Sequence, residues 1–232
     1  MGKDVIIACD FPSAGKTFEF LDMFGKTRPF LKIGMELFYA EGPETVRELK
    51  RRGHKIFLDL KLHDIPNTVK KAMSVLADLD VDIINVHASG TGEMMRAALE
   101  GLCAKGEKRP LLIAVTQLTS TSQETMERDL LIEKPIADVV MHYALNAKNS
   151  GLDGVVCSPL EAKKVHEICG ESFLTVTPGV RFADSDKGDQ KRVMTPEQAK
   201  KEGSDYIVVG RPITAAPDPL ADYKRCVEDF CG

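Results

Sequence analysis

The chain has 232 residues, of which 43% are hydrophobic and 28% are charged, and its formal net charge is −4 at pH 7. This length suffices to bury one large core, and the composition excludes a disordered or fibrous protein. The negative charge and the lack of a basic stripe argue against a general nucleic-acid binder, which needs lysine and arginine along the phosphate backbone. A single phosphate group could still bind through a local arginine.

The N-terminal segment and the cysteines indicate a cytoplasmic protein. The first apolar run is short and ends at Asp10, unlike a signal peptide, and no segment is long enough to span a membrane. The six cysteines include no CxxC pair and no zinc-like spacing. Cys9 and Cys157 lie in apolar runs, where a free thiol packs as a small hydrophobe. We therefore expect reduced, structural cysteines and no membrane partner.

Eight short β-rich runs recur along the chain, each followed by a helical pattern. The expected strands are residues 5–9, 30–33, 55–60, 82–87, 111–117, 154–157, 173–177 and 206–209. Amphipathic stretches with apolar residues at three- and four-residue steps cover residues 44–52, 69–79, 92–104, 136–149 and 160–168. Glycines after these stretches and prolines near helix starts agree with the expected bounds.

Strict alternation of strands and helices predicts a parallel sheet with right-handed crossovers. Eight such units favour the α/β class and a closed (β/α)8 TIM barrel, with residues 1–232 forming a single catalytic domain. An open, doubly wound sheet is the main alternative. No Gly-x-Gly-x-x-Gly follows the first strand, which disfavours a dinucleotide-binding protein.

The third expected strand carries the most informative pattern. Side chains alternate across a strand, so Phe57, Asp59 and Lys61 share one face, and apolar neighbours occupy the other. In a barrel the fully apolar face packs on the helices. Asp59 and Lys61 are therefore expected to point into the barrel at its C-terminal mouth, where barrel enzymes place their active sites.

Charges from neighbouring strands are expected to join this pair. Lys32 lies between two aliphatic residues of the second strand and also points inward, and Asp10 follows the first strand. Charges near a barrel axis need partners, which predicts the alternating order Lys32, Asp59, Lys61 and Asp64. A structural ion-pair network is the alternative. Four charges at the catalytic end favour a chemical role.

The last two strands are followed by residues suited to phosphate. Arg181 closes a Thr-Pro-Gly-Val-Arg segment after the seventh strand, and Gly210 and Arg211 directly follow the eighth. Barrel enzymes often hold phosphate with these loops, through backbone N–H groups and arginine forks. A surface arginine is the alternative. Residues 178–192, rich in charge and glycine, suit both a solvated loop and a lid that closes on phosphate.

The remaining polar residues give weaker signals. His63 has no second ligand at metal-binding spacing, so no metal site is expected. His87 suits a hydrogen-bonded structural role at least as well as catalysis, and Thr119 could bind a ligand or cap a turn. No Ser–His–Asp or Cys–His arrangement can be argued from the spacings.

The string Asp59-x-Lys61-x-x-Asp64-Ile-Pro-Asn-Thr68 resembles the orotidine 5'-phosphate decarboxylase family, whose reaction is the last step of UMP synthesis. The resemblance covers nearly the whole chain. Other matching motifs are Ala-Cys-Asp10-Phe-Pro, Leu-Lys32-Ile-Gly, Val86-His-Ala-Ser-Gly, Leu118-Thr-Ser, Thr177-Pro-Gly-Val-Arg181, Gly188-Asp-Gln190 and Val209-Gly-Arg-Pro-Ile-Thr214. Three departures from the family pattern, Cys9, Thr91 and Gln117, lie outside the charged array.

The resemblance implies decarboxylation of orotidine 5'-monophosphate to UMP and CO2 with no metal or organic cofactor. It implies that Lys61 is the proton donor, that Asp59 faces the substrate carboxylate, and that Lys32 orients Asp59 and a ribose hydroxyl. It also implies a homodimer, in which Asp64 and Thr68 reach the active site from the partner subunit.

The resemblance further implies how the nucleotide is held. Asp10 would bind the ribose, and Thr119 with nearby backbone groups would read the pyrimidine. The phosphate would be held by Gln190, Arg181, Gly210 and Arg211.

Two other functions remain open. A magnesium-dependent sugar-phosphate decarboxylase or aldolase shares the bare Asp-x-Lys-x-x-Asp motif, although the following residues 65–68 disfavour it. A noncatalytic nucleotide-binding barrel would keep the phosphate loops but tolerate the loss of Lys61 or Asp59, and both are present.

Overall fold

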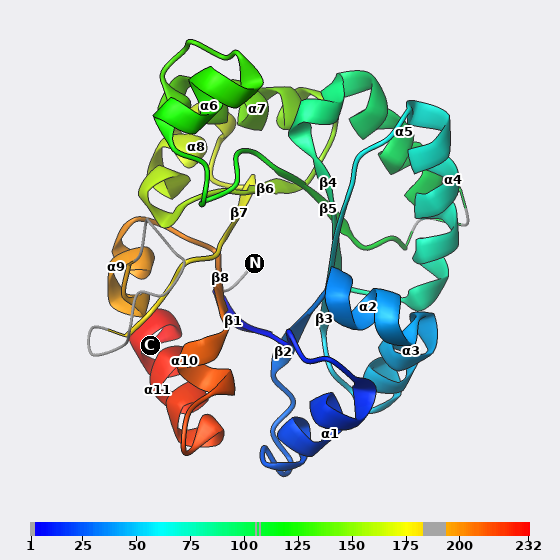
Figure 1. Cartoon of the computed structure of the whole chain (residues 1–232), viewed down its shortest axis with the longest axis vertical. Coiled ribbons are helices and arrows are strands. Elements are labelled where there is room, and N and C mark those ends of the chain that lie inside the picture. The colour runs from blue at the N-terminus through cyan, green and yellow to red at the C-terminus, as the bar shows by residue number, and fades with distance from the viewer. Residues whose placement is uncertain (1–2, 105, 107, 183–193) are drawn as a thin grey trace.

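The computed structural model describes residues 3–104, 106, 108–182 and 194–232. In this part of the chain, parallel strands form a closed barrel in chain order, with β1 beside β8 (Figure 1). The strands are β1 (Asp4–Ala8), β2 (Phe30–Gly34), β3 (Ile56–Leu62), β4 (Ile83–His87), β5 (Leu111–Val115), β6 (Gly154–Val156), β7 (Leu174–Thr177) and β8 (Tyr206–Val209). The predicted (β/α)8 TIM barrel is confirmed, and the open sheet is excluded.

Helices surround the barrel (Figure 1). They are α1 (Ala14–Asp22), α2 (Met35–Glu41), α3 (Pro43–Arg51), α4 (Pro66–Leu76), α5 (Thr91–Cys103), α6 (Gln123–Leu130), α7 (Ile136–Asn149), α8 (Ala162–Cys169), α9 (Pro196–Lys201), α10 (Arg211–Thr214) and α11 (Pro219–Cys231), with 3-10 turns η1 (Ala77–Leu79), η2 (Ala88–Gly90) and η3 (Pro159–Glu161). Several begin at a side-chain cap, such as Ser13 before α1 and Thr195 before α9. Among the described residues, no helix combines the length and apolar character that crossing a bilayer requires.

The strands bury apolar side chains on both faces. Ile56, Leu58 and Leu60 of β3 belong to the core between sheet and helices, as the alternating pattern predicts. Phe57 lies on the other face, in a smaller cluster inside the barrel that includes Phe30 and other residues from the strands. These side chains fill the N-terminal part of the interior, so the polar groups gather toward the C-terminal end.

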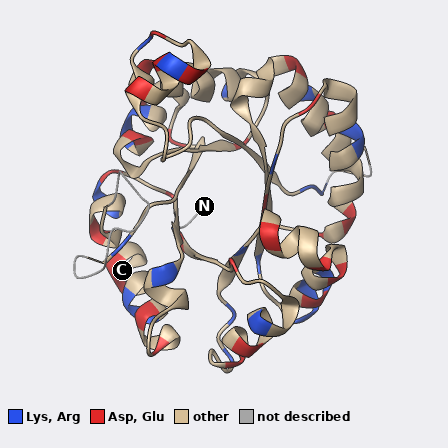
Figure 2. Ribbon diagram, in the orientation of Figure 1, with Lys and Arg blue, Asp and Glu red and all other residues tan. Residues whose placement is uncertain are grey.

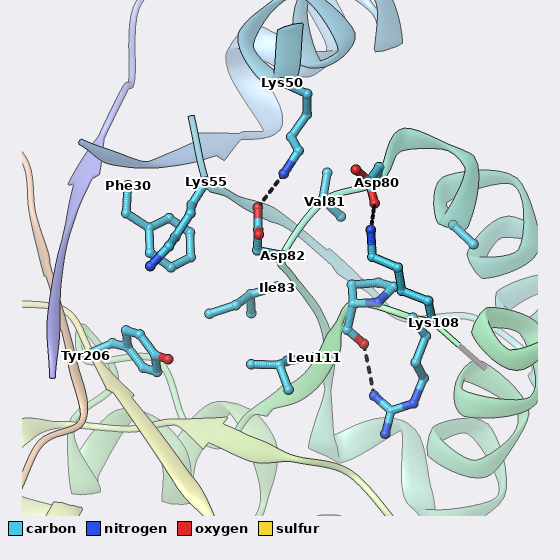
Figure 3. A pocket seen from close by; sticks show the side chains of 13 residues that line it. Phe30, Lys50, Lys55, Asp80, Val81, Asp82, Ile83, Lys108, Leu111 and Tyr206 are labelled. Atoms are coloured by element: carbon cyan, nitrogen blue, oxygen red, sulfur yellow. Dashed lines mark hydrogen bonds and ion pairs between the residues drawn. The ribbon is translucent and has the colours of Figure 1, made fainter. Parts of the chain in front are cut away.

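Aspartates just before three even-numbered strands tie together the N-terminal end of the barrel. Each carboxylate accepts a backbone N–H from the preceding odd-numbered strand. The bonds join Asp82 to Ile56 (2.8 Å), Asp153 to Leu112 (2.7 Å) and Asp205 to Thr175 (2.8 Å). Lys50 neutralises Asp82 at 2.7 Å beside a pocket lined by Phe30 and Tyr206 (Figure 3). This end of the barrel is therefore organised for stability.

Cys9 and Cys157 are packed as their apolar surroundings in the sequence predict. All six lie in the described part of the chain, and all are free thiols. Cys9 and Cys157 are fully buried in the core. Burial raises the pKa of Cys9 to about 12, so this thiol stays protonated at neutral pH and packs as an apolar group.

Helices α4 and α5 approach closely at Gly101. A Cβ atom at this position would lie 2.2 Å from the carbonyl oxygen of Lys70 on α4. Gly101→Ala is therefore expected to push the helices apart and lower the free energy of unfolding by about 1–3 kcal/mol. Urea unfolding followed by far-UV circular dichroism measures this loss.

Gly15→Ala in α1 is the matched control. A Cβ atom there meets only the Ser13 hydroxyl oxygen at 3.9 Å. Because alanine has the higher helix propensity, we expect unchanged or slightly increased stability. An equal loss in both variants would contradict the steric explanation.

Candidate active site

Charged residues are rare on the strands, and most of them meet at one place. Figure 2 shows most lysine, arginine, aspartate and glutamate residues on the surrounding helices and loops. Across the strands these residue types occur only as Asp4, Lys32, Asp59 and Lys61, all of them described residues. Lys32 and Lys61 both contact Asp59 near the C-terminal ends of β2 and β3.

Asp59 lies between two ammonium groups. Its Oδ1 is 2.7 Å from Lys61 Nζ, and its Oδ2 is 3.5 Å from Lys32 Nζ. Lys32 Nζ also lies 2.9 Å from Oδ1 of Asp10, which follows β1. The four residues thus form a chain of alternating charge, and the side chain of Asp59 is only 10% exposed.

Mutual attraction keeps the buried groups ionised. Burial alone would raise the pKa of Asp59, but Lys32 and Lys61 outweigh it, and the net pKa is lowered. Burial likewise opposes the charge of Lys32, but Asp59 and Asp10 raise its pKa above the usual value. Both groups are therefore charged at neutral pH, which places a fixed negative charge between positive ones inside the barrel.

Asp64 does not continue this chain of charges. Its carboxylate is exposed and accepts the N–H of Ile65 at 2.6 Å, and no ion pair among the described residues includes it. The expected order therefore ends at Lys61. The physical reason is that β3 ends at Leu62, so the alternation of side chains no longer applies. Thr68, in the first turn of α4, is also exposed.

The backbone of β3 is irregular at Lys61, which the sequence analysis did not anticipate. Lys61 has φ 52°, in the left-handed region, and the pairing of β3 with β4 shifts between Leu58 and Leu62. Asn85 of β4 accepts the N–H of Lys61 at 2.8 Å and donates to Asp59 Oδ1 at 2.7 Å. Asn85 was not predicted from the sequence, although a polar residue at an inward-facing position of an apolar strand was a detectable signal.

Two of the histidines, His63 and His87, lie near this irregularity. The rings of His63 and His87 are 5.8 Å apart, with His63 exposed and His87 half-buried. Burial, followed by the charges of His63 and Lys61, lowers the pKa of His87. His87 is therefore neutral at physiological pH. In the described part of the chain, no group of three or more His, Cys, Asp or Glu residues could hold a metal ion.

Two adjoining cavities open beside the charged chain. One, of about 240 Å3, is lined by Asp59 and Lys61 and by Thr119 of the loop after β5. The other, of about 440 Å3, lies against Gly210 and Arg211. The cavities share Lys32, Pro178 and Val208, so one elongated ligand can occupy both.

The second cavity has the features expected of an anion site. Arg181 and Arg211 contribute guanidinium groups, and Gly179 and Gly210 leave the backbone accessible. Asp10 also lines this cavity. Gln190 and most of the expected lid, residues 178–192, lie outside the described residues.

Comparisons with known proteins agree with this geometry. The family model described as "Orotidine 5'-phosphate decarboxylase / HUMPS family" matches residues 3–226. A Bacillus cytotoxicus protein named orotidine 5'-phosphate decarboxylase is 55% identical over 235 residues, which cover 100% of this chain and 99% of the relative.

Two solved structures are also similar over nearly the full length. An uncharacterized conserved protein from Geobacillus kaustophilus has a TM-score of 0.87 and 50% identity, covering 97% of this chain and 99% of its own. An orotidine 5'-phosphate decarboxylase from Lactobacillus acidophilus has a TM-score of 0.89 and 44% identity, covering 99% and 100%. The chain therefore belongs to the orotidine 5'-phosphate decarboxylase / HUMPS family.

Proposed function

We propose that this chain converts orotidine 5'-monophosphate to UMP and CO2 in the cytoplasm, with Lys61 as the proton donor and no metal or organic cofactor. This reaction is the final step of de novo pyrimidine nucleotide synthesis. The observation that carries the proposal is the Lys61 ammonium, which Asp59 holds at 2.7 Å on the wall of a cavity that adjoins an arginine-lined anion site. Relatives with this name at 55% identity support the choice of substrate.

The reaction is difficult because the electron pair left on the pyrimidine ring carbon has no neighbouring group that can delocalise it. The bond between the pyrimidine ring and its carboxylate breaks, CO2 leaves, and the electron pair stays on the ring carbon. An ammonium positioned in a closed site stabilises this developing negative charge more than it stabilises the substrate. Lys61 then donates a proton to the ring carbon, and its neutral amine regains a proton from solvent.

Asp59 acts on the negative charge of the substrate carboxylate. In the proposed complex it faces the substrate carboxylate, and the two negative groups repel each other until CO2, which is neutral, departs. Lys32 and Lys61 keep the pKa of Asp59 low after burial has opposed its charge, so the repulsion is present at neutral pH. Lys32 also orients Asp59 and a ribose hydroxyl.

Groups distant from the reacting carbon bind the rest of the nucleotide. Asp10 binds the ribose, and Thr119 contacts the pyrimidine. The phosphate is bound by Arg181, Gln190, Gly210 and Arg211. Binding energy from this distant group can hold the reacting ring against Lys61, so it contributes to turnover as well as to affinity.

A second copy of the chain completes the proposed site. Asp64 and Thr68 are exposed at the mouth of the barrel, and Ile65 between them is 67% exposed. We propose a homodimer in which these residues reach the partner's active site.

The first test uses the purified protein with orotidine 5'-monophosphate and EDTA, and follows the substrate absorbance. We expect UMP to form at the same rate with and without the chelator. The magnesium-dependent sugar-phosphate enzyme predicts no turnover of this nucleotide, or turnover that EDTA abolishes and Mg2+ restores. A noncatalytic barrel predicts binding without turnover.

Lys61→Ala should lower kcat by at least about a thousandfold, because both the electrostatic partner and the proton donor are lost. Circular dichroism and the dissociation constant for UMP should change little. Lys55→Ala, which removes a 63% exposed lysine paired with Asp4 at the other end of the barrel, is the control and should keep normal turnover. Near-normal activity of Lys61→Ala would remove its assigned role.

Arg211→Ala should weaken UMP binding about 10- to 100-fold, because charged hydrogen bonds to the phosphate are lost. Binding of uridine, which has no phosphate, should not change. Arg47→Ala, in an exposed ion pair with Glu44 on α3, serves as the matched control. Titration calorimetry with both ligands makes the comparison, and equal UMP affinity in wild type and Arg211→Ala would overturn the phosphate assignment.

A further inference from the structure

One buried side chain contacts both active-site residues of β3. Asn85 of β4 is 0% exposed. Its Oδ1 accepts the backbone N–H of Lys61 at 2.8 Å, and its Nδ2 donates to Asp59 Oδ1 at 2.7 Å. The same Asp59 oxygen is 2.7 Å from Lys61 Nζ. Asn85 therefore links the backbone of one residue to the carboxylate that holds its ammonium.

The backbone of Lys61 needs such a partner. Leu58 pairs with Ile84 and Leu62 pairs with Val86, so four residue steps on β3 face two on β4. The extra residues form a bulge, in which ladder hydrogen bonds are interrupted. Lys61 sits in this bulge with φ 52°, a conformation that residues other than glycine rarely adopt. The Asn85 oxygen takes the place of a strand carbonyl at this point.

Hydrogen-bond chemistry dictates the orientation of the amide. A backbone N–H can only donate, so it must meet the amide oxygen, and an ionised carboxylate can only accept, so it must meet the amide nitrogen. Asp59 is ionised because Lys32 and Lys61 outweigh the effect of burial on its pKa. Both ends of Asn85 are therefore matched to their partners, and neither can be reversed without placing like groups together.

We propose that Asn85 is a positioning residue, which holds the Lys61 backbone in its left-handed bulge and the Asp59 carboxylate against the Lys61 ammonium. The inference rests on the proposed role of Lys61 as proton donor. Because Asn85 is fully buried, it cannot contact a bound nucleotide. Its loss should therefore lower kcat, with KM and UMP affinity nearly unchanged. A misplacement of about 1 Å in a reacting group can cost about a hundredfold in rate.

Two substitutions by residues of similar size test the separate contributions of the two Asn85 hydrogen bonds. Asn85→Leu removes both, and we expect kcat to fall about a hundredfold at every pH. Asn85→Asp keeps an acceptor for the Lys61 N–H but places a carboxylate against Asp59. Like charge and burial raise the pKa of the introduced carboxyl group. Below that pKa the group is protonated and can donate to Asp59, so kcat relative to wild type should recover as the pH falls.

Thr175→Val is the matched control. Thr175 is also a fully buried polar residue on a barrel strand, but it bonds Asp205 at the opposite end. We expect lower stability in urea unfolding with wild-type kcat. If Asn85→Leu fails to fold, the pH profile of Asn85→Asp still tests the proposal.

The outcomes separate this inference from the proposed function. Wild-type kcat in Asn85→Leu, a pH-independent ratio for Asn85→Asp, or an equal loss of kcat in Thr175→Val would each overturn the positioning role. Wild-type enzyme and Lys61→Ala are assayed alongside. No turnover by wild type, or full turnover by Lys61→Ala, would refute the proposed function itself.

Discussion

The Asp59 carboxylate, held between two ammonium groups, is the interaction on which the site depends. Lys32 approaches it from the neighbouring strand β2 at 3.5 Å, and Lys61 approaches it from β3 itself at 2.7 Å. Without that negative charge, two positive groups would face each other inside the barrel, and burial would favour the neutral form of Lys32. The same carboxylate thus holds the ammonium of the proposed proton donor in place and provides the proposed repulsion toward the substrate.

The N-terminal end of the barrel stabilises the fold, and the C-terminal end holds the candidate active site. At the N-terminal end, aspartates bind strand N–H groups and are neutralised by cations such as Lys50, while Phe30 and Phe57 fill the interior. At the C-terminal end, the charged residues line two cavities and are not packed within an apolar cluster. Close packing at the N-terminal end supports the C-terminal end, where a costly cluster of charges is held in a defined geometry.

The irregularity in β3 connects backbone geometry with chemistry. The bulge turns the Lys61 N–H toward the Asn85 side chain on β4. Residues in sparsely populated conformations concentrate at functional sites, where the surrounding structure must stabilise them. The buried Asn85 amide provides that stabilisation and also bonds Asp59, so backbone and charged cluster are coupled through one side chain.

Local patterns in the sequence determined the barrel and the inward direction of Lys32, Asp59 and Lys61, because strand–helix alternation and a two-residue period act over short stretches. The tertiary structure alone decided two features of the site. Asp64 lies outside the chain of charges, and Asn85 links two residues of β3, Asp59 and Lys61. The first follows from the end of β3 at Leu62. The second depends on the register between β3 and β4, which joins residues more than 20 positions apart. No local pattern encodes such a shift, since it arises only when the strands pair in the closed barrel.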